Sequence, residues 1–88
     1  MGKYNIFISK PALKELERLP QSEKERIKNA LDYLALSPKK GAQVRKLIGM
    51  LSGKYRLRIG NYRAVYMVID EEHAVYVLDV AHRKDVYR

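Results

Sequence analysis

Three strand-like runs joined by very short connections are the feature that most constrains the fold. The runs are Lys54–Ile59, Tyr62–Ile69 and Ala74–Ala81. The first two are separated only by Gly60-Asn61, a strong tight-turn signal, although the Gly-Asn order favours a different turn type from Asn-Gly. Asp70–His73 form the second connection. Connections this short join antiparallel neighbours, so we expect three consecutive antiparallel strands.

The N-terminal half carries the pattern of one strand and two helices. Over Lys3–Ser9, Tyr4, Ile6 and Ile8 alternate with Asn5, Phe7 and Ser9, which predicts a strand. Pro11 is typical of a first helical turn, and Leu19-Pro20 ends that short helix. Ser22–Glu25 fits a capping box and predicts a second helix that runs to about Leu36. The two helices form a helical hairpin.

The chain of 88 residues is expected to form one α+β domain over residues 1–88. After a break at Ser37–Gly41, Lys46–Gly49 is expected to form a short extended piece. Ala64–Ile69 and Ala74–Leu78 are almost continuously apolar, so both faces of the sheet are expected to be covered. The helical hairpin covers one face only. We therefore expect the other face to meet a chain terminus, a ligand or a partner protein.

The charge balance favours a polyanionic partner. Lys and Arg number 18 against 10 Asp and Glu, which gives a formal net charge of +8. This balance suits RNA, DNA, an acidic protein or an anionic membrane surface, and a basic protein with no nucleic-acid role is the alternative.

Several kinds of site are excluded by composition. The chain has no cysteine, which excludes disulfides and thiolate catalysis, and its two histidines, His73 and His82, are too few for a typical zinc site. We therefore expect neither a metal nor another cofactor. The sequence shows neither a signal-peptide pattern nor an apolar run long enough to span a membrane. The expected location is the cytoplasm.

An arginine cluster is the main candidate site. Arg56 and Arg58 are two residues apart in a strand, so they share one face of it. Arg63 begins the next strand just after the turn, near Arg58, and Arg83 follows the last strand on its return toward Arg63. The planar guanidinium fork matches a phosphate, so these four residues predict a phosphate-binding groove. A solvated basic face is an equally good explanation of the spacing alone.

Two further residues near the C-terminal end have candidate roles. His82 is a candidate acid or base near neutral pH, although a single histidine after a strand is more often simply exposed. Tyr87 is a candidate for stacking on an RNA base or for proton transfer, although a tyrosine in this position more often packs as an anchor.

The chain resembles the RelE/ParE superfamily of toxin–antitoxin toxins, and most closely its RelE-like members. The resemblance covers essentially the whole chain. It rests on the order and spacing of four segments: Ala12–Leu16, Tyr55–Arg58, Gly60–Tyr66 and His82–Tyr87. It implies a RelE-like, microbial ribonuclease-like fold in which a four-stranded antiparallel sheet packs on two N-terminal helices.

The resemblance also implies an activity and its partners. RelE-like enzymes are endoribonucleases that cut mRNA in the ribosomal A site without a metal. The RNA's own 2′-hydroxyl attacks the adjacent phosphate, and basic residues neutralise the charge that develops there. The implied partners are a RelB-like antitoxin in a hetero-oligomer, the ribosome and mRNA, with no membrane.

Position by position, the resemblance assigns roles to the candidate residues. Arg56 and Arg58 stand where the best-known members have two lysines, and Arg63 matches the arginine that contacts the scissile phosphate. Arg83 matches the arginine after the last strand, and Tyr87 the tyrosine that stacks near the target base. An arginine hardly acts as a base because its pKa lies above about 12. The general base is therefore left open between His82 and Tyr87.

Two alternatives share the same fold. A ParE-like protein would bind and inhibit DNA gyrase without cutting RNA, and a degenerate member would serve only as an interaction partner. A gyrase inhibitor does not need four arginines around one pocket, which favours the nuclease.

Overall fold

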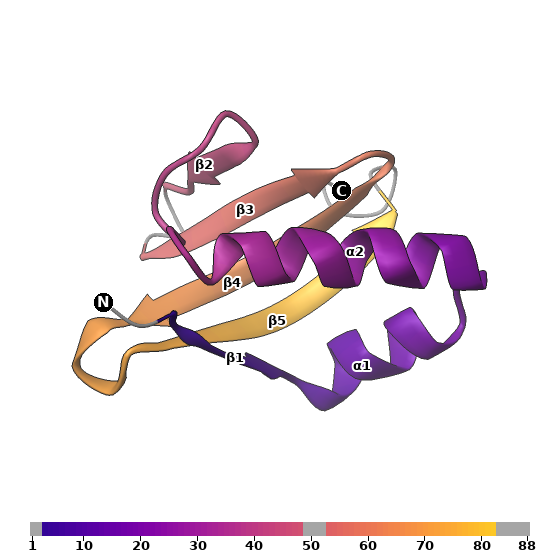
Figure 1. Cartoon of the computed structure of the whole chain (residues 1–88), viewed down its shortest axis with the longest axis horizontal. Helices are drawn as coiled ribbons and strands as arrows, with labels where there is room; N and C mark the ends of the chain where they lie inside the picture. The colour runs from indigo at the N-terminus through magenta and orange to yellow at the C-terminus, as the bar shows by residue number, and fades with distance from the viewer. Residues whose placement is uncertain (1–2, 49–52, 83–88) are drawn as a thin grey trace.

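Two helices pack on one face of a five-stranded sheet in the computed structural model, which describes residues 3–48 and 53–82 (Figure 1). The elements in chain order are β1 (Asn5–Ile8), α1 (Lys10–Glu17), α2 (Gln21–Leu34), β2 (Val44–Lys46), β3 (Lys54–Ile59), β4 (Tyr62–Ile69), η2 (Asp70–Glu72) and β5 (Ala74–His82). The spatial order of the strands is β1-β5-β4-β3-β2. The α+β class expected from the sequence is confirmed.

The sheet differs from the four-stranded antiparallel sheet that was expected. β1 pairs with β5 in parallel, with Phe7 opposite Tyr76, so the sheet is mixed. β2 is a fifth strand at the other edge, antiparallel to β3, and it lies at Val44–Lys46 rather than at Lys46–Gly49. Periodicity locates a strand but does not identify its neighbour, and the helical crossover between β1 and the other strands permits the parallel pairing.

The β3–β4 hairpin has the predicted bounds. Gly60 has a φ of 59°, and His73 is the only non-glycine residue with positive φ in the described part of the chain. A positive φ at the first central residue alone is the sign pattern of a type II′ turn, in which glycine takes the first position. The Gly-Asn order therefore does select a different turn from Asn-Gly, and this turn fixes the register of β3 on β4.

The two helix starts differ in how well the sequence predicted them. Ser9 is the N-cap of α1: its Oγ accepts a hydrogen bond from the Ala12 N–H (3.2 Å) and donates one to the Leu78 carbonyl (2.9 Å). The predicted capping box of α2 is wrong, because the helix begins at Gln21 with Pro20 as N-cap and no side-chain cap. The φ of Pro20, −58°, already suits a helix start, so Ser22 lies inside the first turn.

The core lies between the helices and the sheet, and Tyr66 is its largest fully buried residue. The Tyr66 hydroxyl donates a 2.6 Å hydrogen bond to the Pro38 carbonyl in the loop after α2. The other members of the buried cluster are Ala12, Ile27, Leu31, Leu34, Leu57, Ile59, Ala64, Val75, Val77 and Val80. The helices therefore bury one face of the sheet, and none of the helices within residues 3–48 and 53–82 covers the other, which we call the open face.

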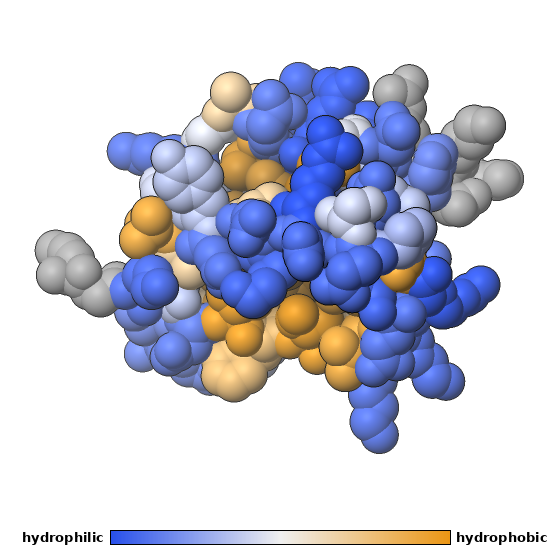
Figure 2. All heavy atoms as spheres, turned by 45° about the vertical axis from the view of Figure 1, so that its right-hand side comes forward, coloured by the Kyte–Doolittle hydropathy of each residue, from blue (hydrophilic) through white to orange (hydrophobic). Residues whose placement is uncertain are grey.

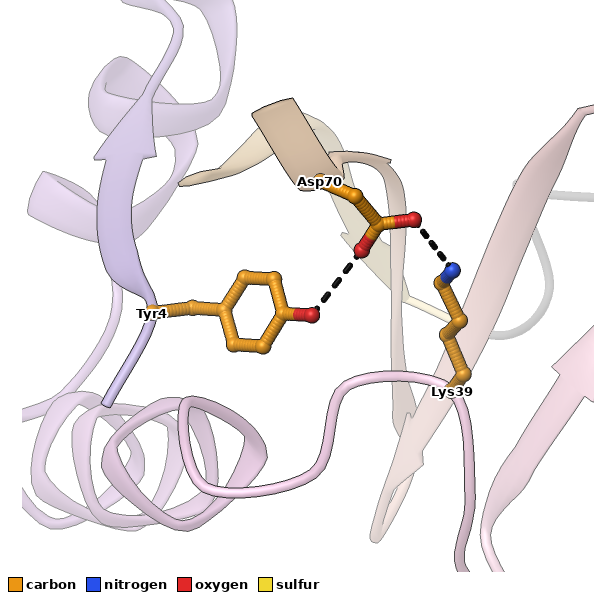
Figure 3. A network of polar contacts seen from close by, with 3 residues as sticks. All are labelled: Tyr4, Lys39 and Asp70. Carbon is orange, nitrogen blue, oxygen red and sulfur yellow. Dashed lines mark hydrogen bonds and ion pairs between the residues drawn. The ribbon is translucent and has the colours of Figure 1, made fainter. Parts of the chain in front are cut away.

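Three distant segments meet in a polar network at one end of the sheet (Figure 3). The Tyr4 hydroxyl donates to Asp70 Oδ1 (2.9 Å), and Lys39 Nζ donates to Asp70 Oδ2. The Tyr4 ring also stacks on His73, with ring centroids 4.0 Å apart. Hydrogen bonds from Lys39 and then Tyr4 lower the pKa of the Asp70 carboxyl. The network connects the chain before β1, the α2–β2 loop and the β4–β5 turn.

Candidate functional site

The predicted arginines of β3 lie on the open face. Leu57 and Ile59 are buried against the helices, with 7% and 5% of their surface exposed. Arg56 and Arg58 alternate with them along the strand and therefore point to the other side. The sequence prediction that Arg56 and Arg58 share one face, opposite Leu57 and Ile59, is confirmed.

The open face carries two cross-strand pairs of arginines. Arg58 lies directly opposite Arg63 in the β3–β4 ladder, and Arg45 lies directly opposite Arg56 in the β2–β3 ladder. Directly opposed residues have Cβ atoms about 4.5–5.5 Å apart, and like charges in that position are destabilising. Four guanidinium groups from three adjacent strands therefore lie on one face. A bound anion would reduce the electrostatic repulsion between them.

Arg45 is a site residue that the sequence analysis missed. It stands outside the segment predicted to be extended, and only the β2–β3 register places it beside Arg56. Val44 packs against the core, and adjacent residues of a strand point to opposite faces, so Arg45 lies on the open face. The alternation of Val44, Arg45 and Lys46 was the available signal, but three residues are too few to establish a strand.

Parts of the arginine side chains are held within the structure. Arg56 and Arg63 are half-buried, and Arg58 is exposed. The Nε atom of Arg56 and the Nε and Nη1 atoms of Arg63 are shielded from solvent. Burial of these atoms restricts the orientation of the two guanidinium groups, which is the condition for a preorganised site.

His82 lies on the other side of the sheet from the arginines. It is opposite Tyr62 in the β4–β5 ladder, and the two rings make an edge-to-face contact with centroids 5.4 Å apart. Tyr62 packs against the core, whereas Arg63 pairs with Ala81 on the open face. The structure therefore brings Arg56, Arg58 and Arg63 together and separates His82 from them. Arg83 and Tyr87 lie outside the described residues.

Two apolar grooves flank α2 on the helical side of the molecule. One, of about 390 Å³, lies between β1, α1 and α2 over Ile6, Ile8 and Leu16. The other, of about 410 Å³, lies between α2 and β2 and is bordered by Tyr33 and Leu36, which are 78% and 60% exposed. Figure 2 shows apolar surface above and below a hydrophilic band on this side. The grooves are candidate protein-binding surfaces.

Metal and membrane signals are absent from the described residues. No group of three or more His, Asp or Glu side chains within residues 3–48 and 53–82 is arranged to hold a metal ion. Over the same ranges, no helix has the length and apolar character needed to cross a bilayer.

Comparisons with known sequences identify relatives along nearly the whole chain. A family model described as the ParE toxin of the type II toxin–antitoxin system parDE matches residues 6–87. The chain is 30% identical over 88 residues to the putative toxin RelE1 of Methanocaldococcus jannaschii, covering 98% of this chain and 97% of that protein. It is 37% identical over 82 residues to the mRNA interferase toxin RelE of Escherichia coli K12, covering 92% and 84%.

Solved structures agree with the sequence relatives. The archaeal RelE–RelB complex from Pyrococcus horikoshii matches with a TM-score of 0.81 at 29% identity, covering 97% of this chain and 100% of that one. The isolated RelE toxin of E. coli matches with a TM-score of 0.76 at 34% identity, covering 90% and 83%.

Proposed function

The chain belongs to the RelE/ParE superfamily and is a RelE-type toxin of a type II toxin–antitoxin system, and we propose that it is a ribosome-dependent endoribonuclease that cleaves mRNA. The observation that carries the proposal is that two pairs of arginines lie directly opposite each other on the open face, Arg58 with Arg63 and Arg45 with Arg56. A relative at 37% identity bears the name mRNA interferase, which points to the same chemistry.

In the proposed reaction, the RNA supplies its own nucleophile. The 2′-oxygen of one nucleotide attacks the adjacent phosphorus, the bond to the 5′-oxygen breaks, and the products carry a 2′,3′-cyclic phosphate and a 5′-hydroxyl. Negative charge peaks on the phosphorane, where Arg58 and Arg63 bind the scissile phosphate and Arg56 and Arg45 lie beside it. Preorganised cations of this kind stabilise the transition state more than the substrate, and the reaction needs no metal.

The remaining predicted site residues enter the proposal differently. Arg83 completes the phosphate site, and Tyr87 stacks on the target base, both as the family resemblance implies. His82 lies on the helical side of the sheet, whereas Arg63 lies on the open face. This separation does not support the role of general base for His82.

A RelB-like antitoxin is the proposed partner in a toxin–antitoxin hetero-oligomer. Relatives of this chain are found in complexes of RelE with RelB. An amphipathic helix fits the apolar groove over Ile6, Ile8 and Leu16, and an extended segment fits an edge of the sheet. The ribosome and mRNA are the proposed targets, which puts the site of action in the cytoplasm.

The direct test is to map mRNA ends after brief expression of the toxin. We expect cuts inside translated codons, upstream fragments that end in a 2′,3′-cyclic phosphate, and no such cuts with Arg63→Ala. Downstream fragments bearing a 5′-phosphate would require another mechanism. Uncut mRNA in cells whose growth the toxin arrests would reject the nuclease.

A second candidate function is inhibition of DNA gyrase, which the match to the ParE family model favours. A supercoiling assay run beside the RNA mapping separates the two functions. Normal supercoiling with cut mRNA supports the nuclease, and lost supercoiling with intact mRNA supports the gyrase inhibitor.

A further inference from the structure

The buried valines of β5 break the alternation of a regular strand. Val75, Val77 and Val80 are all at most 1% exposed, although the spacing between the last two is three residues. The register explains this, because Val65 is opposite Asp79 while its neighbour Tyr66 is opposite Val77. Leu78 is therefore an extra residue in β5, and the strand contains a β-bulge at this point.

The bulge determines the face on which Asp79 lies. In a regular strand Asp79 would share the face of Val75 and Val77, where a carboxylate would be buried in the core. The extra residue shifts the alternation, so Val80 occupies the core and Asp79 is exposed on the open face. Bulges reorient side chains and are over-represented beside active sites.

Asp79 joins the arginines on this face. It is opposite Val65, and Val65 is opposite Arg56, so the three residues lie in one row across β5, β4 and β3. Arg63 is opposite Ala81, which makes Asp79 its diagonal neighbour at about 7–8 Å, within reach of a long side chain. Asp79 is the only carboxylate in strands β1–β5 as the structure describes them.

We propose, resting on the proposed ribonuclease function, that Asp79 is the catalytic general base of the open face. One oxygen of its carboxylate accepts the 2′-hydroxyl proton as the 2′-oxygen bonds to phosphorus. The bond from phosphorus to the 5′-oxygen breaks, the 5′-oxygen takes a proton from water, and Asp79 returns its proton to solvent. Arg58 and Arg63 hold the phosphate beside it, so the base and the cations act on adjacent atoms of one nucleotide.

The surroundings of Asp79 on the open face are cationic or uncharged. The charged strand side chains on its face are Arg63 from β4 and, farther away, Lys54, Arg56 and Arg58 from β3 and Arg45 from β2. The neighbours from β5 and β1 are Ala81, Tyr76 and Phe7, and the Tyr76 hydroxyl donates a hydrogen bond to the Glu72 carboxylate (2.6 Å) in the β4–β5 turn. If Asp79 only weakened phosphate binding, removing it would strengthen RNA binding and leave cleavage as fast or faster.

The test measures single-turnover cleavage on ribosomes programmed with mRNA, at saturating toxin. We expect Asp79→Asn to lower the rate by about 10²–10⁴-fold, the usual contribution of general base catalysis, with binding to the ribosome retained. Asp79→Glu should restore part of the rate. Glu71→Gln, which removes one negative charge from the exposed β4–β5 turn, is the matched control and should cleave like the wild type.

The outcomes distinguish this inference from the proposed function. If the wild type cleaves and Asp79→Asn cleaves equally fast, Asp79 is not the base and the ribonuclease stands. If the wild type does not cleave, both proposals fail. Should Asp79→Asn not fold, Asp79→Ala is measured in its place: a comparable loss of rate with ribosome binding retained supports the base, and a rate equal to wild type overturns it.

Discussion

Arg58 and Arg63 face each other directly across the β3–β4 ladder, on the open face of the sheet, opposite to α1 and α2. Two like charges in this relationship repel each other. Natural proteins retain such an arrangement where a function requires it. The pair is therefore the strongest structural sign that the open face binds an anion.

Replacing Arg63 by alanine should abolish cleavage without harming the fold. Removing one preorganised charge contact costs about 10²–10³ in rate, and the variant should still unfold cooperatively. Single-turnover cleavage and thermal melting measure the two effects. Arg18→Ala is the control, because Arg18 lies on the helical side with 78% of its side chain exposed. Full activity in Arg63→Ala would exclude Arg63 from the site.

Arg45 should contribute to RNA binding although the alternation over Val44–Lys46 was too short to predict its strand. Its pairing with Arg56 extends the cationic surface to the edge strand. We expect Arg45→Ala to weaken RNA binding and to reduce the slope of log affinity against log salt by about one. Titrations of a single-stranded RNA at several salt concentrations measure the slope. An unchanged slope would mean that Arg45 makes no phosphate contact.

Tyr66 should stabilise the fold through its hydroxyl group. Tyr66→Phe removes the 2.6 Å hydrogen bond to Pro38 and leaves that carbonyl without this donor, at a cost of about 1–3 kcal/mol. Urea denaturation measures the change, with the 78% exposed Tyr33 as the matched Tyr→Phe control. Burial raises the pKa of Tyr66, so its neutral form is favoured in the folded state. Stability from this group is accordingly lost as the pH rises through its folded pKa.

Asp70 should make the stability of the fold decrease at low pH. Hydrogen bonds from Lys39 and Tyr4 lower its pKa in the folded state. Its contribution is complete above the unfolded-state pKa of about 3.9 and is lost as the pH falls through the lower folded value. Asp70→Asn should therefore lower the melting temperature at pH 7 and reduce its fall on acidification. Asp32→Asn, which breaks a surface pair with Lys28 on α2, is the control and should change little.

The sequence by itself determined the local elements of this protein. The bounds of β3 and β4, the type of turn at Gly60-Asn61 and the shared face of Arg56 and Arg58 follow from alternation and turn chemistry within a few residues. The resemblance to RelE-like toxins also depended only on the order of short segments, and the comparisons bear it out.

Only the tertiary structure decided which residues meet. The parallel pairing of β1 with β5, the placement of Arg45 beside Arg56 and the bulge that turns Asp79 toward the arginines are relationships between distant segments. Local patterns specify the faces of one strand, but the register between strands depends on how the whole core packs. A shift of one residue in β5 decides whether Asp79 is buried or stands on the cationic face.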